Sequence, residues 1–249
     1  MFRKFHAYLI LPLLDLIYPP VCLTCDNRPT GRSSAICGEC WGSLTPVASG
    51  HPVAREIRAR FNSEGCVSDI TSCFLFEKAG KMQDIIHHVK YRGMTSTGVE
   101  LGEKLGRKLL DEGLLDTSGV LVPVPLHRLK RRERGYNQSE FICRGISAIT
   151  GMTVVNDLLI RQSNTLSQTK LTIEERRRNV REAFALNEKR GRDVRGAPII
   201  LVDDVITTGS TIEACARTLL AAGAARVFAA SIALAEQKNA APSPSAPHL

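Results

Sequence analysis

The sequence predicts an α/β protein, in which a parallel sheet flanked by helices follows a small cysteine-rich module. Short apolar runs of strand length alternate with amphipathic stretches from about residue 70 to residue 235, as in βαβ units of a parallel sheet. Two Cys-x-x-Cys pairs stand ahead of that region. An apolar strand at 199–202 runs into acidic and then hydroxyl residues that open a helix, which is where this class of fold binds its ligands.

The composition describes a folded, basic chain. Of the 249 residues, 43% are hydrophobic, and lysine and arginine outnumber aspartate and glutamate by 33 to 25, which gives a formal charge of +8. The hydrophobic fraction argues against wholesale disorder. The positive charge favours anionic partners such as phosphate esters, pyrophosphate or nucleic acid. Because no apolar run approaches the ~20 residues that span a bilayer, we expect no membrane span.

The two ends of the chain differ from the region between them. Residues 1–20 are apolar, but Pro12 and Asp15 interrupt the run, so we expect an amphipathic helix packed on the next module and not a signal peptide. Residues 236–249 form a tail rich in proline, serine and alanine, which cannot build a core and is expected to be disordered. The modules expected between the ends are a zinc ribbon at 21–50 and the α/β domain at 70–235.

Two closely spaced cysteine pairs indicate a metal site. Cys22 and Cys25 form the first pair, Cys37 and Cys40 form the second, and eleven residues separate the pairs. This is the spacing of a four-thiolate zinc site, in which the metal replaces the core that so small a module lacks. Disulfides or an iron–sulfur cluster are the alternatives. We expect structural Zn²⁺, a core separate from that of the α/β domain, and a reducing, cytoplasmic location. The cysteines expected to be small buried hydrophobes are Cys66, Cys73, Cys143 and Cys215.

The elements of the α/β region follow from apolar spacing and from residues that begin or end helices and strands. The spacing predicts helices at about 82–89 and 101–110. An apolar strand at 120–122 is stopped by proline, which cannot donate to a ladder. Asn137 and Glu140 form a capping box that opens another helix. The remaining expected elements are extended segments at 154–155 and 158–160, a basic helix opened by Thr172, a buried strand at 199–202, a helix at 212–222 and a strand at 227–234.

The segment 202–211 carries the strongest indication of function. Asp203 and Asp204 follow a strand, and hydroxyl residues surround Gly209 where the next helix begins. Gly209 lets the main chain approach a phosphate, and the unpaired N–H groups at the start of the helix attract an anion. Two adjacent carboxylates suit ribose hydroxyls or a hydrated Mg²⁺. The residues expected to hold a phosphate are Thr207, Thr208, Gly209, Ser210 and Thr211.

Other interpretations of this segment account for less of it. An ordinary strand–turn–helix would use one aspartate and one threonine as caps, but it leaves the second carboxylate and the other hydroxyls unexplained. A nucleoside triphosphatase would need G-x-x-x-x-G-K-[ST], and a dinucleotide-binding fold would need G-x-G-x-x-G. The sequence contains neither motif.

Two basic stretches are candidates for holding the rest of a phosphorylated ligand. Arg128, Lys130 and Arg134 follow the strand at 120–122, where cations can cradle a pyrophosphate group. A solvated face or a nucleic-acid patch is the alternative. The second stretch, 168–180, is polar ahead of its helix, as expected of a loop that closes over substrate, and a charged helix surface is the alternative. Its candidate residues are Lys170, Arg176 and Asn179, and Lys90 and Arg92 are further candidates.

The motifs together resemble the ComF family, whose members are phosphoribosyltransferase-like proteins named for competence in DNA uptake. The segment 202–211 is similar to the signature loop of type I phosphoribosyltransferases. The resemblance implies that Asp203 and Asp204 hold the 2′ and 3′ hydroxyls of phosphoribosyl pyrophosphate, while residues 207–211 wrap its 5′-phosphate. Many relatives carry a second set of paired cysteines, where this chain keeps only the widely spaced Cys66 and Cys73. The motifs that carry the resemblance are the four cysteines after Leu14–Pro20, Val122–Leu126, Arg134–Gln138, Glu175–Asn179 and Val202–Val205.

Two functions are consistent with these residues. The first is an enzyme that transfers phosphoribose to an acceptor and releases pyrophosphate, with Mg²⁺ and with Asp203 and Asp204 as catalytic residues that position the substrate. The second is a non-catalytic accessory protein that senses phosphoribosyl pyrophosphate or a nucleotide and contacts single-stranded DNA or a DNA-uptake partner. No motif identifies the acceptor.

Overall fold

The computed structural model describes residues 21–29, 34–113, 119–162 and 183–236. Within them, five parallel strands form one sheet with the order β1-β7-β6-β2-β3, and β4 (Leu159–Arg161) pairs antiparallel with β5 (Phe184–Leu186). This confirms the predicted α/β fold with a parallel sheet. The sheet strands, from one edge to the other, are β1 (Asp69–Phe76), β7 (Arg226–Ala235), β6 (Pro198–Ile206), β2 (Val120–Pro123) and β3 (Thr153–Val154).

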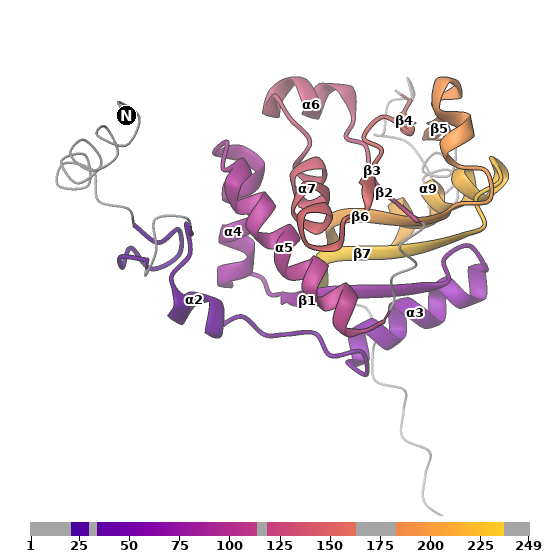
Figure 1. The fold of residues 1–249 in the computed structure, drawn as a ribbon. Helices are drawn as coiled ribbons and strands as arrows, with labels where there is room; N and C mark the ends of the chain where they lie inside the picture. Colours follow the sequence, from indigo (N-terminus) through magenta and orange to yellow (C-terminus); the bar gives the residue numbers. More distant parts are fainter. Residues whose placement is uncertain (1–20, 30–33, 114–118, 163–182, 237–249) are drawn as a thin grey trace, which may run out of the picture.

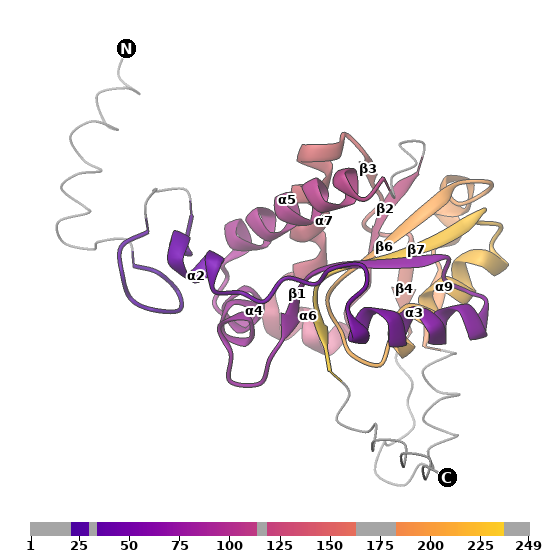
Figure 2. The ribbon, with the colours of Figure 1, turned by 90° about the horizontal axis from the view of Figure 1, so that it is seen from below.

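Helices cover both faces of the sheet (Figures 1 and 2). On one face, α4 (Lys81–Tyr91), α5 (Thr95–Asp111) and α7 (Gln138–Thr150) share a core with the strands. On the other face, α3 (Pro52–Glu64) and α9 (Ser210–Ala221) form a second core. The shorter helices are α2 (Gly38–Gly42), α6 (Arg128–Arg134) and the 3₁₀ helix η2 (Glu188–Asp193).

Most of the expected elements are present, with longer bounds. In α4 the predicted apolar stripe is buried, including Met82 and Val89. In α7 the Asn137 side chain accepts from the Ser139 N–H as the predicted cap, while Glu140 pairs with Arg131 at 3.0 Å. Neither α3 nor β1 is predicted from the sequence. The N-terminal segment, the helix at Thr172 and the C-terminal tail lie outside the described residues, apart from Glu236.

Two glycines bring α5 and α7 into direct backbone contact. A Cβ atom at Gly145 would lie 2.0 Å from the Val99 carbonyl oxygen, and one at Gly102 would lie 2.1 Å from the Ile142 carbonyl oxygen. No other residue fits either position without moving a helix. This contact fixes α7, whose first turn borders the site described below.

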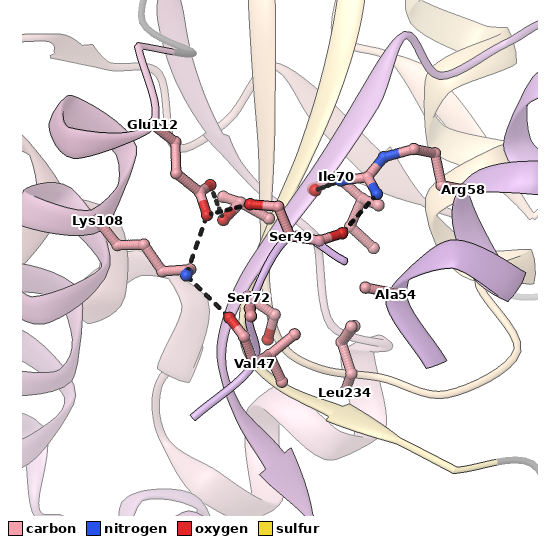
Figure 3. Close-up of a pocket in the computed structure, with 11 residues that line it drawn as sticks. Val47, Ser49, Ala54, Arg58, Ile70, Ser72, Lys108, Glu112 and Leu234 are labelled. Atoms are coloured by element: carbon pink, nitrogen blue, oxygen red, sulfur yellow. Dashed lines mark hydrogen bonds and ion pairs between the residues drawn. The ribbon is translucent and has the colours of Figure 1, made fainter. Parts of the chain in front are cut away.

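The segment between α2 and α3 runs along the outer edge of β1. The Val47 N–H donates to the Cys73 carbonyl at 2.9 Å, and the Leu75 N–H donates to the Thr45 carbonyl at 2.9 Å. Lys108 of α5 fastens this segment, because its ammonium donates to the Val47 carbonyl at 2.9 Å and pairs with Glu112 at 3.0 Å (Figure 3). The network surrounds a cavity of only about 10 Å³, the room that one water molecule needs.

The cysteine module packs on the sheet domain instead of standing apart from it. Trp41 lies 6.1 Å from the Phe74 ring, measured between ring centroids, and donates to the Glu100 carboxylate at 3.2 Å. Cys40 and Leu44 belong to the same buried cluster as the residues under α4 and α5. The prediction of two separate cores is therefore wrong: in a ribbon this small, the side chains that the metal does not need are buried against the neighbouring helices.

No helix in the described parts of the chain is both long enough and apolar enough to cross a bilayer.

Candidate functional site

The carboxyl end of β6 leads through a short hydroxyl-rich loop into α9. Gly209 occupies the cap position of α9 with φ +78°, and no side chain caps the helix there. The contact that comes closest to a side-chain cap is a long one of 3.4 Å, in which the Ser210 N–H donates to Thr208 Oγ1. Thr207 and Thr208 are exposed beside it. The first turn of this three-turn helix thus presents the N–H groups and dipole end that bind anions.

A buried aromatic ring supports this loop from below. Phe61 of α3 is fully buried, and a Cβ atom at Gly209 would lie 2.7 Å from its ring. Gly209 is therefore required twice, for its positive φ and for the contact with Phe61. Arg60, the preceding residue of α3, pairs with Glu213 in the first turn of α9 at 2.7 Å. Helix α3, which the sequence did not predict, thus fixes the position of the loop at 207–209.

Asp203 and Asp204 lie within β6, whereas the sequence predicted that they follow the strand. The strand continues because Val205 and Ile206 still pair with Ala233 and Leu234 of β7. Asp204 is buried, with 4% of its surface exposed, whereas Asp203 is half-buried. The two carboxylates therefore meet the helices at the carboxyl edge of the sheet.

Each carboxylate has a partner from the helical layer. Ser139, in the first turn of α7, donates to Asp203 Oδ1 at 3.3 Å. Lys90, at the end of α4, places its ammonium 2.8 Å from Asp204 Oδ2. Burial and the adjacent Asp204 carboxylate raise the pKa of Asp203 to about 7, although Lys90 and Ser139 oppose the shift. A carboxyl group in this state readily gains from a ligand that brings positive charge or hydroxyl donors.

The segment Arg134–Gln138 holds the parts of this site together. The Tyr136 hydroxyl donates to the Val89 carbonyl, next to Lys90. The Arg134 guanidinium donates to the Tyr91 hydroxyl at 3.1 Å. Asn137 is buried and donates to the Val124 carbonyl at 3.0 Å. This motif thus ties the end of α4 to the segment after β2.

The predicted pyrophosphate residues lie on or at the end of α6. Arg128 and Lys130 are exposed, whereas Arg134 is partly buried and engaged with Tyr91 and Gln138. No described contact joins these three cations to Asp203 or Asp204. The closing-loop candidates Lys170, Arg176 and Asn179 lie outside the described residues.

A cavity of about 420 Å³ opens beside these residues. The segments after β2 and β3 form two of its walls, and Asn137 belongs to its lining, two residues from the Ser139 that contacts Asp203. Arginine side chains make part of the lining positive, and apolar residues make up another part. The lining arginines, Arg128, Arg131 and Arg161, argue for an anionic occupant, although Glu140 and Asp157 also line the cavity and Arg131 pairs with Glu140.

The oxygen atoms at the end of β6 fit a magnesium ion. Carboxylate oxygens are the ligands that Mg²⁺ prefers. Asp204 Oδ2 is buried and accepts no well-directed hydrogen bond from the described residues, so the ion pair with Lys90 is its compensation. Asp203 and Asp204 are the residues that would hold the ion.

The four cysteines of the N-terminal module form one cluster. Their sulfur atoms all lie within 4.8 Å of one another, close to the ~3.8 Å edge of a zinc tetrathiolate tetrahedron. Main-chain N–H groups point at the sulfur atoms, with Cys37 N–H 3.3 Å from Cys22 Sγ. Although burial opposes it, hydrogen bonds from Thr24 and the Cys37 N–H lower the pKa of Cys22 to about 6. The geometry and the thiolate-forming donor set fit zinc. The other four cysteines are buried, as predicted.

The sequence motifs predict the loop at 207–211 but not the residues that support it. Lys90 is only a further candidate there, and Ser139 and Phe61 belong to no motif. Phe61 could have been found, because Val53, Ile57 and Phe61 follow one another at helical spacing after Pro52. Nothing local points to Ser139, because only the fold brings it to Asp203.

Comparison with known proteins matches both parts of the chain. The family described as "Phosphoribosyl transferase domain" matches residues 93–246, and the family described as "Double zinc ribbon domain" matches residues 13–54. The second range contains four cysteines, enough for one four-thiolate site.

Curated relatives match over most of the chain. DNA utilization protein YhgH of Escherichia coli K12 is 30% identical over 83% of this chain and 87% of its own length. Competence protein ComFC of Bacillus subtilis is 26% identical over 82% of this chain and 80% of its own. Competence protein F of Haemophilus influenzae is 33% identical over 40% of this chain and 43% of its own.

Proposed function

Because this chain belongs to the ComF family and carries a zinc ribbon ahead of a phosphoribosyltransferase domain, we propose that it binds phosphoribosyl pyrophosphate or a nucleotide at the end of β6. We further propose that it transfers phosphoribose to an acceptor and releases pyrophosphate. The observation that carries the proposal is the pair Asp203 and Asp204 on the strand that leads, through residues 205–209, into the uncapped start of α9.

Each part of the site has a role in this proposal. Asp203 and Asp204 accept hydrogen bonds from the ribose hydroxyls, which fixes the sugar over the sheet edge. The 5′-phosphate binds the main-chain N–H groups and hydroxyls of residues 207–211. Mg²⁺, when bound, neutralises charge on the pyrophosphate group. No side-chain nucleophile is needed, since the reaction rests on positioning and on stabilisation of developing charge.

The pyrophosphate end of the ligand faces the basic residues. Arg128 is the candidate that the structure supports best, because it lines the 420 Å³ cavity after β2. Lys130 lies on the same short helix. Arg134 positions the end of α4 through its hydrogen bond to the Tyr91 hydroxyl. Lys170, Arg176 and Asn179 remain the candidates for closing over the substrate. We also propose a cytoplasmic location, because none of the eight cysteines forms a disulfide and four of them form the metal cluster, as is typical of reducing compartments.

Calorimetric titration with phosphoribosyl pyrophosphate and Mg²⁺ tests the proposal. The double variant Asp203→Asn/Asp204→Asn should bind at least tenfold more weakly, or roughly 1.4 kcal/mol. Glu103→Gln removes a surface carboxylate that pairs with Arg107 on α5 and serves as the control. The proposal fails if the wild type, with Mg²⁺, binds neither phosphoribosyl pyrophosphate nor a nucleoside monophosphate at millimolar concentration. A screen of acceptors for pyrophosphate release then separates an enzyme from a sensor.

A second candidate function is a non-catalytic accessory role in DNA uptake. The exposed face of α6 supports it, because Lys130, Arg131 and Arg132 are all exposed there, and Tyr91 is exposed beside Arg134. Bases of single-stranded DNA stack on such aromatic rings while cations bind the phosphates. Fluorescence anisotropy with labelled single-stranded DNA tests this role. Lys130→Ala should weaken binding and make it less dependent on salt, and unchanged binding would argue against this surface.

A further inference from the structure

The Asp204 carboxylate is compensated on one oxygen by hydrogen bonding and on the other by charge alone. The Val205 N–H donates to Asp204 Oδ1 at 2.7 Å. Oδ2 lies 2.8 Å from the Lys90 ammonium but accepts no well-directed hydrogen bond within the described part of the chain. A point charge that is close but not aligned with the oxygen lone pairs behaves as a counter-ion. Lys90 therefore neutralises this carboxylate without saturating its ligand capacity.

Lys90 is brought to this position by the fold. The residues on either side of it are both held, Val89 by the Tyr136 hydroxyl and Tyr91 by the Arg134 guanidinium. The Arg134 guanidinium also lies 4.8 Å from the centre of the Tyr91 ring. An exposed lysine that could reach several acceptors would not need contacts that hold both of its neighbours in place. The end of α4 is thus fixed so that Lys90 reaches the carboxylate pair.

A divalent cation and the ammonium compete for the same oxygen. A magnesium ion bound to Asp204 Oδ2 would stand within a few ångströms of Lys90 Nζ, and two cations that close repel each other strongly in a partly buried site. The side chain of Lys90 is flexible and 23% exposed, so it can leave Asp204 when a better partner is present. The phosphate groups of a ligand are such a partner.

We propose that Lys90 is a built-in counter-ion, which occupies the cation position of the Asp203–Asp204 pair in the ligand-free protein and is exchanged for a divalent metal ion when a phosphorylated ligand binds. This inference rests on the proposed function, because it requires a phosphorylated ligand at this site. The released ammonium then contacts a phosphate oxygen of the ligand. As a result, metal and ligand bind cooperatively: the metal alone must displace Lys90, whereas the ligand gives Lys90 a new partner.

Titration with Mn²⁺ alone, and then with Mn²⁺ and phosphoribosyl pyrophosphate together, tests the exchange. Lys90→Met should bind Mn²⁺ alone at least tenfold more tightly than the wild type and should bind the phosphorylated ligand at least tenfold more weakly. Lys90→Arg, which keeps the charge, should bind Mn²⁺ alone as weakly as the wild type. The opposite signs of the two changes distinguish exchange from a merely structural role, which would weaken both.

Lys108→Met is the matched control. Lys108 is 24% exposed and pairs with Glu112 at 3.0 Å (Figure 3), so it resembles Lys90 in burial and pairing but lies in the network beside β1. We expect its Mn²⁺ affinity to equal that of the wild type. Lys90→Gln is measured in parallel, and it replaces the methionine variant in the comparison if the latter does not fold.

The outcomes separate this inference from the proposed function. Equal Mn²⁺ affinity of the wild type and the neutral Lys90 variants would overturn the counter-ion role, even if the wild type binds phosphoribosyl pyrophosphate. Tighter Mn²⁺ binding by the neutral variants, in a protein that binds neither phosphoribosyl pyrophosphate nor a nucleoside monophosphate, would support the counter-ion role and refute the proposed function.

Discussion

Replacement of Asp203 by asparagine should stabilise the protein at alkaline pH and leave its stability unchanged at acidic pH. The folded protein raises the pKa of this carboxyl from 3.8 to about 7, because burial and the Asp204 carboxylate disfavour its charged form. Between these two values the folded state binds more protons than the unfolded state. The free energy of unfolding therefore falls as the pH rises from about 4 to about 7. Above pH 7 the destabilisation caused by the ionised Asp203 carboxylate is complete.

The size of the effect follows from the same shift. One pKa unit corresponds to 1.36 kcal/mol, so the shift sets an upper limit of about 4 kcal/mol at pH 8. The asparagine variant keeps the main hydrogen bond of this side chain, because its amide oxygen can still accept from the Asp204 N–H, as Asp203 Oδ1 does at 2.9 Å. Since Asp203 is half-buried and solvent can relax around it, we expect a gain of about 2 kcal/mol.

Urea denaturation of Asp203→Asn and the wild type between pH 4 and pH 8 measures this difference directly. The two curves should meet near pH 4 and separate as the pH rises. Glu103→Gln, at a partly exposed position of α5, controls for the removal of one negative charge from a basic chain. A variant that is less stable than the wild type at pH 8, or a difference that does not change with pH, would show that Asp203 is a capping or structural carboxylate and would refute the reasoning.

Further predictions concern the metal and the packing of the helices. Purified protein should contain about one zinc per chain by elemental analysis, and four thiols paired as disulfides would exclude the metal site. Cys37→Ser should lose the metal and also lower the melting temperature of the sheet domain in calorimetry, because Cys37 and Ile85 belong to one core; an unchanged domain transition would contradict this. Gly145→Ala should cost at least about 2 kcal/mol in urea denaturation, because its Cβ would lie 2.0 Å from the Val99 carbonyl oxygen. Equal stability would mean that α5 and α7 can separate freely.

The strand, loop and helix of residues 198–221 could be predicted from the sequence because their determinants are contiguous. A strand, two carboxylates, a glycine and hydroxyls within ten residues specify the local structure with little help from the rest of the chain. The partners of the carboxylates could not be predicted in this way. Lys90 and Asp204 are far apart in the sequence, and only the packing of α4 against the sheet brings them to 2.8 Å.

Two of the elements that the sequence did not predict, α6 and β1, lack apolar periodicity. None of the residues of α6 is buried, so its seven positions show no helical stripe, and its ends depend on the His127 cap and on Gly135 at φ +80°. In β1 the polar residues Thr71 and Ser72 are buried, which interrupts the apolar run that would identify a buried strand. The prediction of a separate core for the cysteine module rests on neighbouring residues alone. It is wrong because Trp41 packs on Phe74, a contact between distant residues that the sequence does not show.

The segment along β1 has a consequence for the solubility of the protein. β1 is an edge strand of the sheet, and an uncovered edge is a template for pairing with another chain. Here residues 45–47 occupy that edge through hydrogen bonds to Cys73 and Leu75, and the cysteine module anchors the segment from one side. The segment therefore shields this edge of the sheet from pairing with a second chain, and the hydrogen bond from the Lys108 ammonium to the Val47 carbonyl holds it in place.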